Sequence, residues 1–486
     1  MAEREGGRGA RLVEQRARAR LVWRLVALHG LPMAALTAAP ALAAAAEAEW
    51  RLAGVLAAAA LPPVAAFAHL RLRGGPVGEP RRIEALVAVA AIFLIGALMA
   101  TPAFMVLGMP PVDALFEAVS GITTTGLSVA REAESWPVSA HFLRAWLQWA
   151  GGFAFAVAAV ALVVGPGVVA LRLGFAGGPG EGILGSARSR ARQLLGAYLA
   201  ITAVALAALA MLAEDPVEGA LLAFAGVSTG GFAPSAVSVA GAGPAVQVVA
   251  LLACLAGATS MTLWARSRRE GLGPLIGDPE LRMLLTLILA VGAAAVLIEG
   301  LRDGGPGLWP AAFAVVSAQT TAGYSAGDTA AMAPATLALL IAAMAVGGSV
   351  GSTAGGVKVF RLAFAAAAAR LALTRVALSP RALATPRVLG RPADTEDGIH
   401  AFALLSMFGF GAGLGWLALM LCGAAPLPAL FDAVSAFGTV GLSTGVTGPE
   451  LPTVGKLALA LAMMLGRLEF IAFLALVNPS TWFRGV

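Results

Sequence analysis

The chain has 486 residues, of which 59% are hydrophobic and only 12% are charged. Ordinary soluble domains carry about 25% charged residues, so this composition excludes a soluble protein and indicates a chain that lies in a lipid bilayer. The net charge of +6 does not indicate nucleic-acid binding, because the arginines lie in short segments and form no continuous basic face. Cys254 and Cys422 lie inside apolar stretches, without the spacing of a metal site or a disulfide framework.

The N-terminus joins a basic run to an apolar stretch at 21–45, which is too long for the hydrophobic region of a signal peptide. It predicts an uncleaved first membrane helix. Further stretches near the roughly 20 residues that cross a hydrocarbon core recur along the chain. They lie at about 52–70, 83–107, 142–169, 194–212, 245–264, 283–298, 337–376, 401–421 and 454–476.

Positive charges gather in every second connection when the N-terminus is placed in the cytoplasm, which predicts a multi-pass protein of the cytoplasmic membrane. The basic connections hold Arg71, Arg73, Arg81, Arg82, Arg188, Arg190, Arg192, Arg266, Arg268, Arg269, Arg375, Arg381, Arg387 and Arg391. The opposite connections are acidic or mixed. This alternation requires four more apolar stretches that enter from outside and return without crossing, ending near Gly126, Gly231, Gly323 and Gly441.

These four stretches share one pattern, a threonine two positions before a glycine that an apolar residue and a small residue follow. A phenylalanine lies ten positions and a serine six positions before the glycine in all copies but the second, which has Leu221 and Ala225. Each copy lies between two membrane spans. The residues up to each glycine are Thr124, Thr125, Gly126; Thr229, Gly230, Gly231; Thr321, Ala322, Gly323; and Thr439, Val440, Gly441.

Non-helical backbone is tolerated at membrane depth only where protein or a water-filled cavity satisfies its polar groups, so four such hairpins predict a central pore. A central glycine adopts positive φ freely, which lets successive carbonyls replace the hydration shell of a cation. The alternative interpretation is that these turns only break helices in a chain with 59 glycines. Four copies in register favour the pore.

The repeats resemble the TrkH/KtrB/HKT superfamily of potassium transporters, whose chains hold four pseudo-repeats with one filter glycine each. Two further segments carry the resemblance, at 347–359 and 464–469. Two additional spans before the first repeat favour the TrkH branch. The resemblance implies potassium as the transported ion bound at the filter residues, a homodimer with one pore per chain, and a cytosolic TrkA-like nucleotide-binding ring as regulator. Four filter glycines imply a preference for potassium over sodium.

The predicted fold class is an all-α integral membrane protein with four pseudo-symmetric units of helix, re-entrant pore loop and helix around a central pore. Residues 1–82 form a cytoplasmic arm and two extra membrane helices. The four pore repeats are expected at 83–175, 188–270, 280–378 and 397–486. No segment is long enough for a separate soluble domain.

A glycine-rich run at 347–358 interrupts a stretch otherwise long enough for one helix, and glycine costs about 1 kcal/mol per helical position relative to alanine. We expect the helix to break there. With the resemblance, the run is a movable intramembrane gate whose lysine repels cations. The alternative is a packing kink with that lysine reaching the cytoplasmic surface. The candidate gating residues are Gly347, Gly348, Gly351, Gly355, Gly356 and Lys358.

Arg467 and Glu469 lie inside the last span, where an unpaired charge costs roughly 2.5 to 3.5 kcal/mol. They belong either to the gate, with Arg467 paired to an acid across the pore, or to a structural ion pair near the cytoplasmic end. Asp113, Glu117 and Asp432 either concentrate cations at the pore mouth or stabilise the N-termini of the pore helices.

Two other function classes remain open from the residues alone. An intramembrane enzyme needs a nucleophile with a base, paired aspartates or metal ligands at membrane depth, and no such constellation is visible. We therefore expect no enzyme, no catalytic residue and no covalently bound cofactor. A secondary transporter of another cation or small solute also brings broken helices together near the midplane, but such folds usually show two inverted halves.

Overall fold

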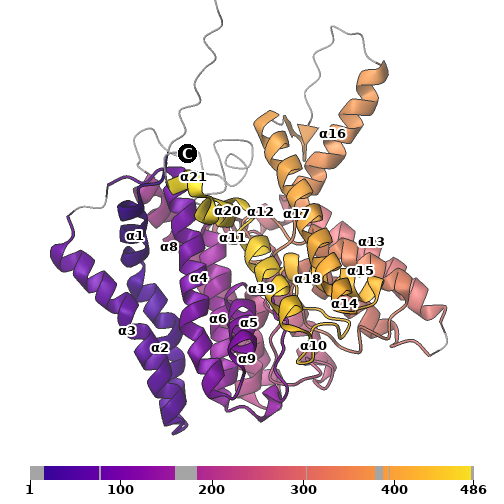
Figure 1. The fold of residues 1–486 in the computed structure, drawn as a ribbon. Helices are drawn as coiled ribbons and strands as arrows, with labels where there is room; N and C mark the ends of the chain where they lie inside the picture. Colours follow the sequence, from indigo (N-terminus) through magenta and orange to yellow (C-terminus); the bar gives the residue numbers. More distant parts are fainter. Residues whose placement is uncertain are drawn as a thin grey trace, which may run out of the picture.

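The computed structural model describes residues 16–75, 78–158, 183–302, 304–377, 387–392 and 395–482. Apart from a hairpin of two-residue strands, β1 (Arg387–Val388) and β2 (Arg391–Pro392), its regular elements are helical, so the all-α prediction is confirmed (Figure 1). The predicted N-terminal arm at 1–15 and the end of the first predicted pore repeat at 159–175 lie outside the described residues.

Three N-terminal helices precede the region of the four predicted pore repeats: α1 (Ala19–Leu28), α2 (Gly30–Ala46) and α3 (Trp50–Arg73). The first predicted span is a bent pair, because α1 and α2 meet at an angle of 44°. The break falls at His29, whose ring nitrogen Nδ1 lies 2.8 Å from the carbonyl oxygen of Leu25. The second predicted span is the continuous helix α3, although it contains Pro62 and Pro63.

The rest of the described residues contain four groups, in each of which a long helix precedes a short one and a further helix follows it. The first group holds α4 (Arg82–Val106), α5 (Pro111–Ile122), the 3-10 turn η1 (Ala133–Ser135) and α6 (Val138–Ala158). The second holds α8 (Ile183–Leu212), α9 (Pro216–Val227), α10 (Pro244–Ala258), α11 (Met261–Glu270) and α12 (Gly273–Gly277). The third holds α13 (Pro279–Gly300), α14 (Leu308–Thr320), α15 (Pro334–Val346) and α16 (Val359–Ala377). The fourth holds α17 (Thr395–Leu421), α18 (Pro426–Phe437), α19 (Thr453–Arg467), α20 (Ile471–Val477) and α21 (Pro479–Trp482).

The short helices α5, α9, α14 and α18, called the pore helices below, have 12, 12, 13 and 12 residues. At 1.5 Å per residue they are about 18 to 20 Å long, which is too short for a hydrocarbon core of about 30 Å. Pro111, Pro216 and Pro426 begin three of them, where a fixed φ favours the helix and the missing N–H costs nothing. Each pore helix therefore enters the protein and ends inside it.

Within the described residues, five helices are long and apolar enough to cross a membrane, or up to eight spans if each bent pair counts as one. The predicted spans at 245–264 and 454–476 are bent pairs of helices in the structure. Helices α10 and α11 meet at 96°, and α19 and α20 meet at 115°. The second bend lies at Glu469 and Phe470, whose positive φ values of 50° and 59° are incompatible with a continuing helix.

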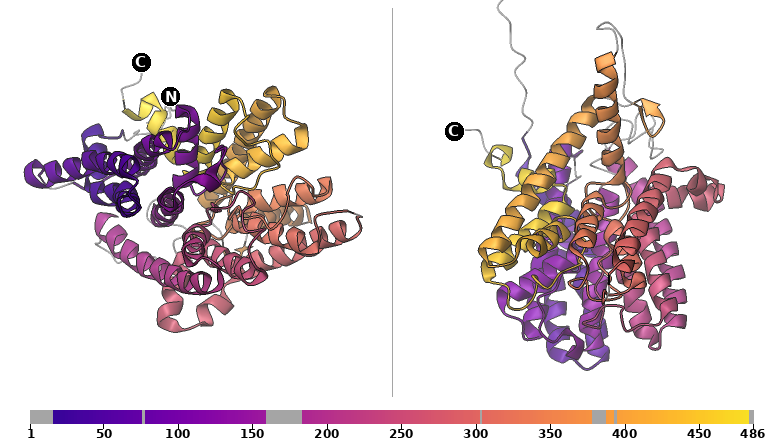
Figure 2. Two further views of the ribbon diagram at one scale, coloured as in Figure 1. Left: turned by 90° about the horizontal axis from the view of Figure 1, so that it is seen from below. Right: turned by 90° about the vertical axis from the view of Figure 1, so that its right-hand side faces the viewer.

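Seen along its long axis, the molecule is a ring of helix groups in chain order, with the N-terminal helices outside it (Figure 2, left). Buried apolar side chains fill the space between neighbouring groups. One large cluster joins the first, third and fourth groups through Phe116, Leu340 and Phe431. A second joins the second and third groups through Phe313 and Tyr324. The core thus surrounds the ends of the four pore helices.

Candidate functional site

The chain makes the same turn after each of the four pore helices. The N–H of the residue before the glycine donates to the carbonyl five positions earlier, at 2.8 to 2.9 Å in all four copies. This bond is the long hydrogen bond of a Schellman C-cap. The threonine of each copy is left-handed, with φ values of 55°, 54°, 54° and 48° at Thr124, Thr229, Thr321 and Thr439. A shared sequence pattern therefore folds into a shared backbone geometry.

The four glycines that follow form a closed ring. Their φ values lie between 77° and 98°, a region that side chains with a Cβ rarely adopt. A Cβ on Gly126 would collide with the carbonyl oxygen of Gly230, and a Cβ on Gly231 with that of Ala322. The same relation leads from Gly323 to Val440 and from Gly441 back to Thr125. Each glycine thus lies against the next hairpin, and the fourth hairpin closes on the first.

The threonine hydroxyls lie behind this ring, and all four threonines are fully buried. Within the described residues, Thr124 Oγ1 and Thr439 Oγ1 have no hydrogen-bond partner. Thr229 Oγ1 donates to the carbonyl of Ser228, and Thr321 Oγ1 accepts from the Gly355 N–H at 2.7 Å. A buried hydroxyl without a partner costs about 1 to 3 kcal/mol. Hydroxyl and carbonyl oxygens are the kind of ligand that a dehydrated cation takes.

One cavity of about 560 Å³ contains all four ring glycines in its lining. The remaining lining comes mainly from the segments that follow the glycines, with Ser128, Ser325 and Ser443 among them. Glu132 and Glu134 also line it. The ring therefore opens on one side into a polar vestibule.

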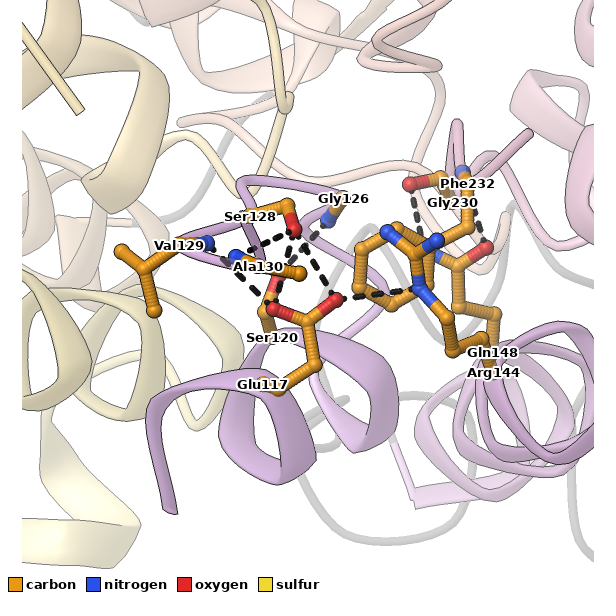
Figure 3. Close-up of polar contacts among 10 residues, drawn as sticks. All are labelled: Glu117, Ser120, Gly126, Ser128, Val129, Ala130, Arg144, Gln148, Gly230 and Phe232. Atoms are coloured by element: carbon orange, nitrogen blue, oxygen red, sulfur yellow. Dashed lines mark hydrogen bonds and ion pairs between the residues drawn. The ribbon is translucent and has the colours of Figure 1, made fainter. Parts of the chain in front are cut away.

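Glu117 fastens the segment that follows the first ring glycine (Figure 3). Its carboxylate accepts the Ser128 hydroxyl at 3.1 Å and the Val129 N–H at 3.4 Å, and forms an ion pair with Arg144 Nε at 3.0 Å. Glu117 is fully buried, and the Arg144 guanidinium lies 3.9 Å from the ring centre of Phe232. This carboxylate joins hairpins one and two.

Asp432 occupies the equivalent position in the fourth hairpin and is also fully buried. It accepts the Ser443 hydroxyl at 2.7 Å and the Thr447 N–H at 2.8 Å. Neither carboxylate lies in the first turn of its pore helix, so the predicted stabilisation of the helix N-terminus is wrong for Glu117 and Asp432. Cation attraction at the mouth stays a prediction. Asp113 does lie in the first turn of α5, where it pairs with Lys456 at 2.7 Å.

Gln148 supports the second hairpin and was not singled out from the sequence. In hairpins one and four, the hydroxyl of Ser120 or Ser435 accepts the N–H of the ring glycine, at 3.0 and 3.1 Å. The second hairpin lacks this serine. Instead Gln148 of α6 donates to the Gly230 carbonyl at 2.5 Å and accepts the Phe232 N–H at 3.2 Å (Figure 3). The signal that could have revealed it is an amide inside an apolar span.

Tyr324 links hairpins two and three through its hydroxyl, which donates to the Leu222 carbonyl of α9 at 2.8 Å. The side chain is fully buried. Ser317, although it stands where hairpins one and four have their serine, has no hydrogen-bond partner for its hydroxyl within the described residues. Hairpin three is therefore held by a neighbour rather than by its own serine.

The run 347–358 breaks the long stretch between α15 and α16 as predicted, and we call it the glycine-rich loop. Gly347, Gly351 and Gly356 have φ values of 71° to 74°. The loop lies against the C-terminal ends of three pore helices. Gly355 N–H donates to Thr321 Oγ1 at 2.7 Å, and Gly356 N–H donates to the Gly438 carbonyl at 3.1 Å. Around it, Gly348 packs tightly against Ala258, and the Thr353 hydroxyl donates to the Val227 carbonyl at 3.1 Å.

The three predicted charged gating residues all lie near this loop. Lys358 is 2% exposed and its ammonium donates to the Ala354 carbonyl, so the alternative in which it reaches the surface is wrong. Arg467 is fully buried and donates to the Thr353 carbonyl at 2.8 Å, with its guanidinium 4.1 Å from the ring centre of Phe155.

Arg467 thus contacts a loop carbonyl and an aromatic face where an acid was expected. Glu469 forms an ion pair of 2.7 Å with Arg361 of α16, so the predicted structural ion pair is present at Glu469 but does not include Arg467. Charged side chains at membrane depth are costly unless they have such partners. The ends of α16 and α19 are therefore tied to each other and to the loop.

The fold and this site define a multi-pass membrane transport protein in which four hairpins of one chain meet in a single ring. Residues 91–482 match the family described as TrkH, cation transport protein. The chain belongs to this family, and it is a transporter rather than an enzyme.

Relatives with assigned names support the same placement. The chain is 31% identical over 396 residues to the Trk system potassium uptake protein TrkI of Halomonas elongata, covering 78% of this chain and 80% of that protein. It is 28% identical over 394 residues to the Trk system potassium uptake protein TrkH of Escherichia coli, covering 76% and 79%. The crystal structure of the potassium transporter TrkH from Vibrio parahaemolyticus has the same fold, with a TM-score of 0.83 at 23% identity, covering 96% of this chain and 99% of that one.

Proposed function

We propose that this protein takes up potassium across the cytoplasmic membrane through a selectivity filter made by the four hairpins. The observation that carries the proposal is the closed ring of positive-φ glycines, each in contact with a carbonyl of the next hairpin. Rings of backbone carbonyls replace the hydration shell of a potassium ion in selective pores. The relatives described above are potassium uptake proteins, which agrees with this choice of ion.

The filter residues have three roles in this proposal. The glycines Gly126, Gly231, Gly323 and Gly441 bring the backbones close enough for one ion to touch all four hairpins. The residues before them, Thr125, Gly230, Ala322 and Val440, supply ring carbonyls. The buried threonines Thr124, Thr229, Thr321 and Thr439 supply further oxygen ligands. Neutral oxygens bind a dehydrated cation without holding it so tightly that conduction stops.

The glycine-rich loop is the gate in this proposal. Its hydrogen bonds to Thr321 and to the Gly438 carbonyl place it directly against the filter turns, where it obstructs an ion that leaves the ring. Gly347, Gly351 and Gly356 provide the backbone freedom for a second arrangement. Lys358 and Arg467 hold the loop carbonyls of Ala354 and Thr353 in the arrangement described here.

The proposal includes an orientation and partners. The N-terminus lies in the cytoplasm, and the vestibule of about 560 Å³ faces the outside, because the arginine-rich connections lie at the opposite ends of the helices. The membrane lipids are the solvent of the outer surface. A second copy of the chain and a cytosolic TrkA-like nucleotide-binding ring are the protein partners implied by family resemblance.

Growth of bacteria that lack their own potassium uptake, on medium low in potassium, tests the transport proposal. The native chain should restore growth, whereas Gly126→Ala and Gly441→Ala should not, because both glycines have positive φ and would collide with the next hairpin. Gly409→Ala is the matched control, since a Cβ there meets nothing within 4 Å. Absence of growth with an expressed native chain would overturn potassium uptake, and growth with both filter variants would overturn the filter.

A further inference from the structure

A second cavity, of about 830 Å³, lies between the N-terminal helices α1, α2 and α3 and the first helix of the pore region, α4. It is remote from the filter, whose residues do not appear in its lining. Most of its wall is apolar, with Val26, Met33, Ala66, Ile95 and Met99 among the lining residues. Nothing in the proposed transport function uses this cleft.

Two backbone features open the cleft. Gly30 at the start of α2 lies so close to α3 that a Cβ would collide with the Pro63 carbonyl. Beyond this contact α3 diverges from α1, because the chain bends by 44° between α1 and α2, and Pro62 and Pro63 interrupt the hydrogen bonds of α3. Figure 1 shows α3 leaning away from α1 toward its C-terminal end.

The open end of the cleft is basic. Arg20 and Arg24 of α1 and Arg73 of α3 line it, and His69 lies one turn before Arg73. Within the described residues, none of the three arginines has an acidic partner, and no acid lines the cavity. The nearby Arg18 differs, since Glu84 neutralises it at 2.7 Å. Three uncompensated guanidiniums at the end of an apolar cleft favour an anion with an apolar tail.

The depth of the cleft matches one leaflet of a bilayer. Pro63 at its closed end precedes Arg73 at its basic end by ten residues of helix, which corresponds to about 15 Å. Half of a hydrocarbon core of about 30 Å has the same thickness. Trp23, an exposed aromatic side chain of the type that lies at membrane interfaces, also lines the cleft near the arginines.

We propose that this cleft binds one anionic phospholipid of the cytoplasmic leaflet. Arg20, Arg24 and Arg73 contact the headgroup phosphate, and an acyl chain fills the apolar part between α1 and α3. The leaflet follows from the proposed orientation, but lipid binding itself does not depend on ion transport and is tested without it. The lipid would wedge α3 against α4 and so join the N-terminal helices to the pore region.

Native mass spectrometry of the purified full chain measures the binding. The protein, freed of endogenous lipid, is titrated with palmitoyl-oleoyl phosphatidylglycerol and, in parallel, with the zwitterionic phosphatidylethanolamine of the same chains. We expect one phosphatidylglycerol to bind preferentially. An arginine near a membrane surface contributes roughly a fivefold gain in binding of anionic lipid, so replacing all three with glutamine should lower the preference on the order of a hundredfold.

The matched control replaces Arg268, Arg269 and Arg370 with glutamine, which removes the same charge elsewhere and should leave the preference unchanged. Ala66→Trp keeps the arginines but fills the cleft, and it should also abolish the preference. Glycerol phosphate, which lacks acyl chains, should not compete.

Three outcomes would each overturn the proposal. The first is equal binding by the native chain and by the variant that lacks Arg20, Arg24 and Arg73. The others are undiminished binding by Ala66→Trp and full competition by glycerol phosphate. Size-exclusion chromatography shows whether a variant is misfolded. If the triple variant is, Arg24→Lys, which keeps the charge, must retain the preference for phosphatidylglycerol.

Discussion

Arg467 offers the sharpest test of the proposed gate, because its guanidinium holds a carbonyl of the glycine-rich loop from another helix. Its Nη1 donates to the Thr353 carbonyl at 2.8 Å inside a fully buried site. Arg467→Met keeps most of the side-chain volume and its apolar contact with Phe155, but removes this hydrogen bond. The loop then loses this tether.

The size of the effect follows from that one bond. A hydrogen bond to a charged group stabilises a protein by about 1.5 to 3 kcal/mol, and each 1.4 kcal/mol changes an equilibrium tenfold. If the tether is absent when the loop moves, the displaced population should rise roughly 10-fold to 150-fold. Potassium flux through the purified chain alone should rise by a comparable factor until the loop is displaced most of the time.

Rubidium tracer uptake into proteoliposomes containing the purified chain alone measures this flux. Arg370→Met is the matched control, because Arg370 lies exposed on α16, twelve residues beyond Lys358 at the end of the loop. Uptake by the control should equal that of the native chain within twofold. Uptake by a folded Arg467→Met protein at the native level would refute the tether, and lower uptake would show that Arg467 supports the pathway instead of closing it.

Three further substitutions test the filter and its supports. Gly323→Ala should abolish uptake in a folded protein, because positive φ alone costs about 1 to 2 kcal/mol for a residue with a Cβ. The control Gly413→Ala has open space around its Cβ and should transport normally in the growth assay. Gln148→Leu leaves the buried Gly230 carbonyl and the buried Phe232 N–H without partners, so discrimination of potassium over sodium in competition flux assays should fall. Unchanged discrimination would contradict the positioning role of Gln148. Glu117→Gln leaves the buried Arg144 guanidinium without its counter-charge, at a cost of about 3 to 5 kcal/mol, so the melting temperature should drop. Glu450→Gln removes a charge from an exposed pair and should leave the melting temperature unchanged. Equal melting temperatures for both variants would contradict the reasoning.

Local sequence was enough to find the four hairpins. Thr-x-Gly determines the left-handed threonine and the positive-φ glycine within a few residues, and the recurrence of the pattern in four copies shows that they are equivalent. The break at the glycine-rich loop was equally predictable, because the conformational cost of glycine in a helix is a local property. Composition and charge alternation were sufficient to predict an all-helical membrane protein.

The contacts between hairpins depended on the tertiary structure, because their partners lie far apart in the chain. Gln148 replaces the serine that the second hairpin lacks from 82 positions away, and Glu117 binds an arginine of another helix, so sequence reasoning missed the first and misassigned the second. Arg467 was expected to meet an acid, but the fold presents a carbonyl and an aromatic face. The sequence does show that a charged residue inside a membrane span needs a partner. The identity of that partner depends on how distant helices pack.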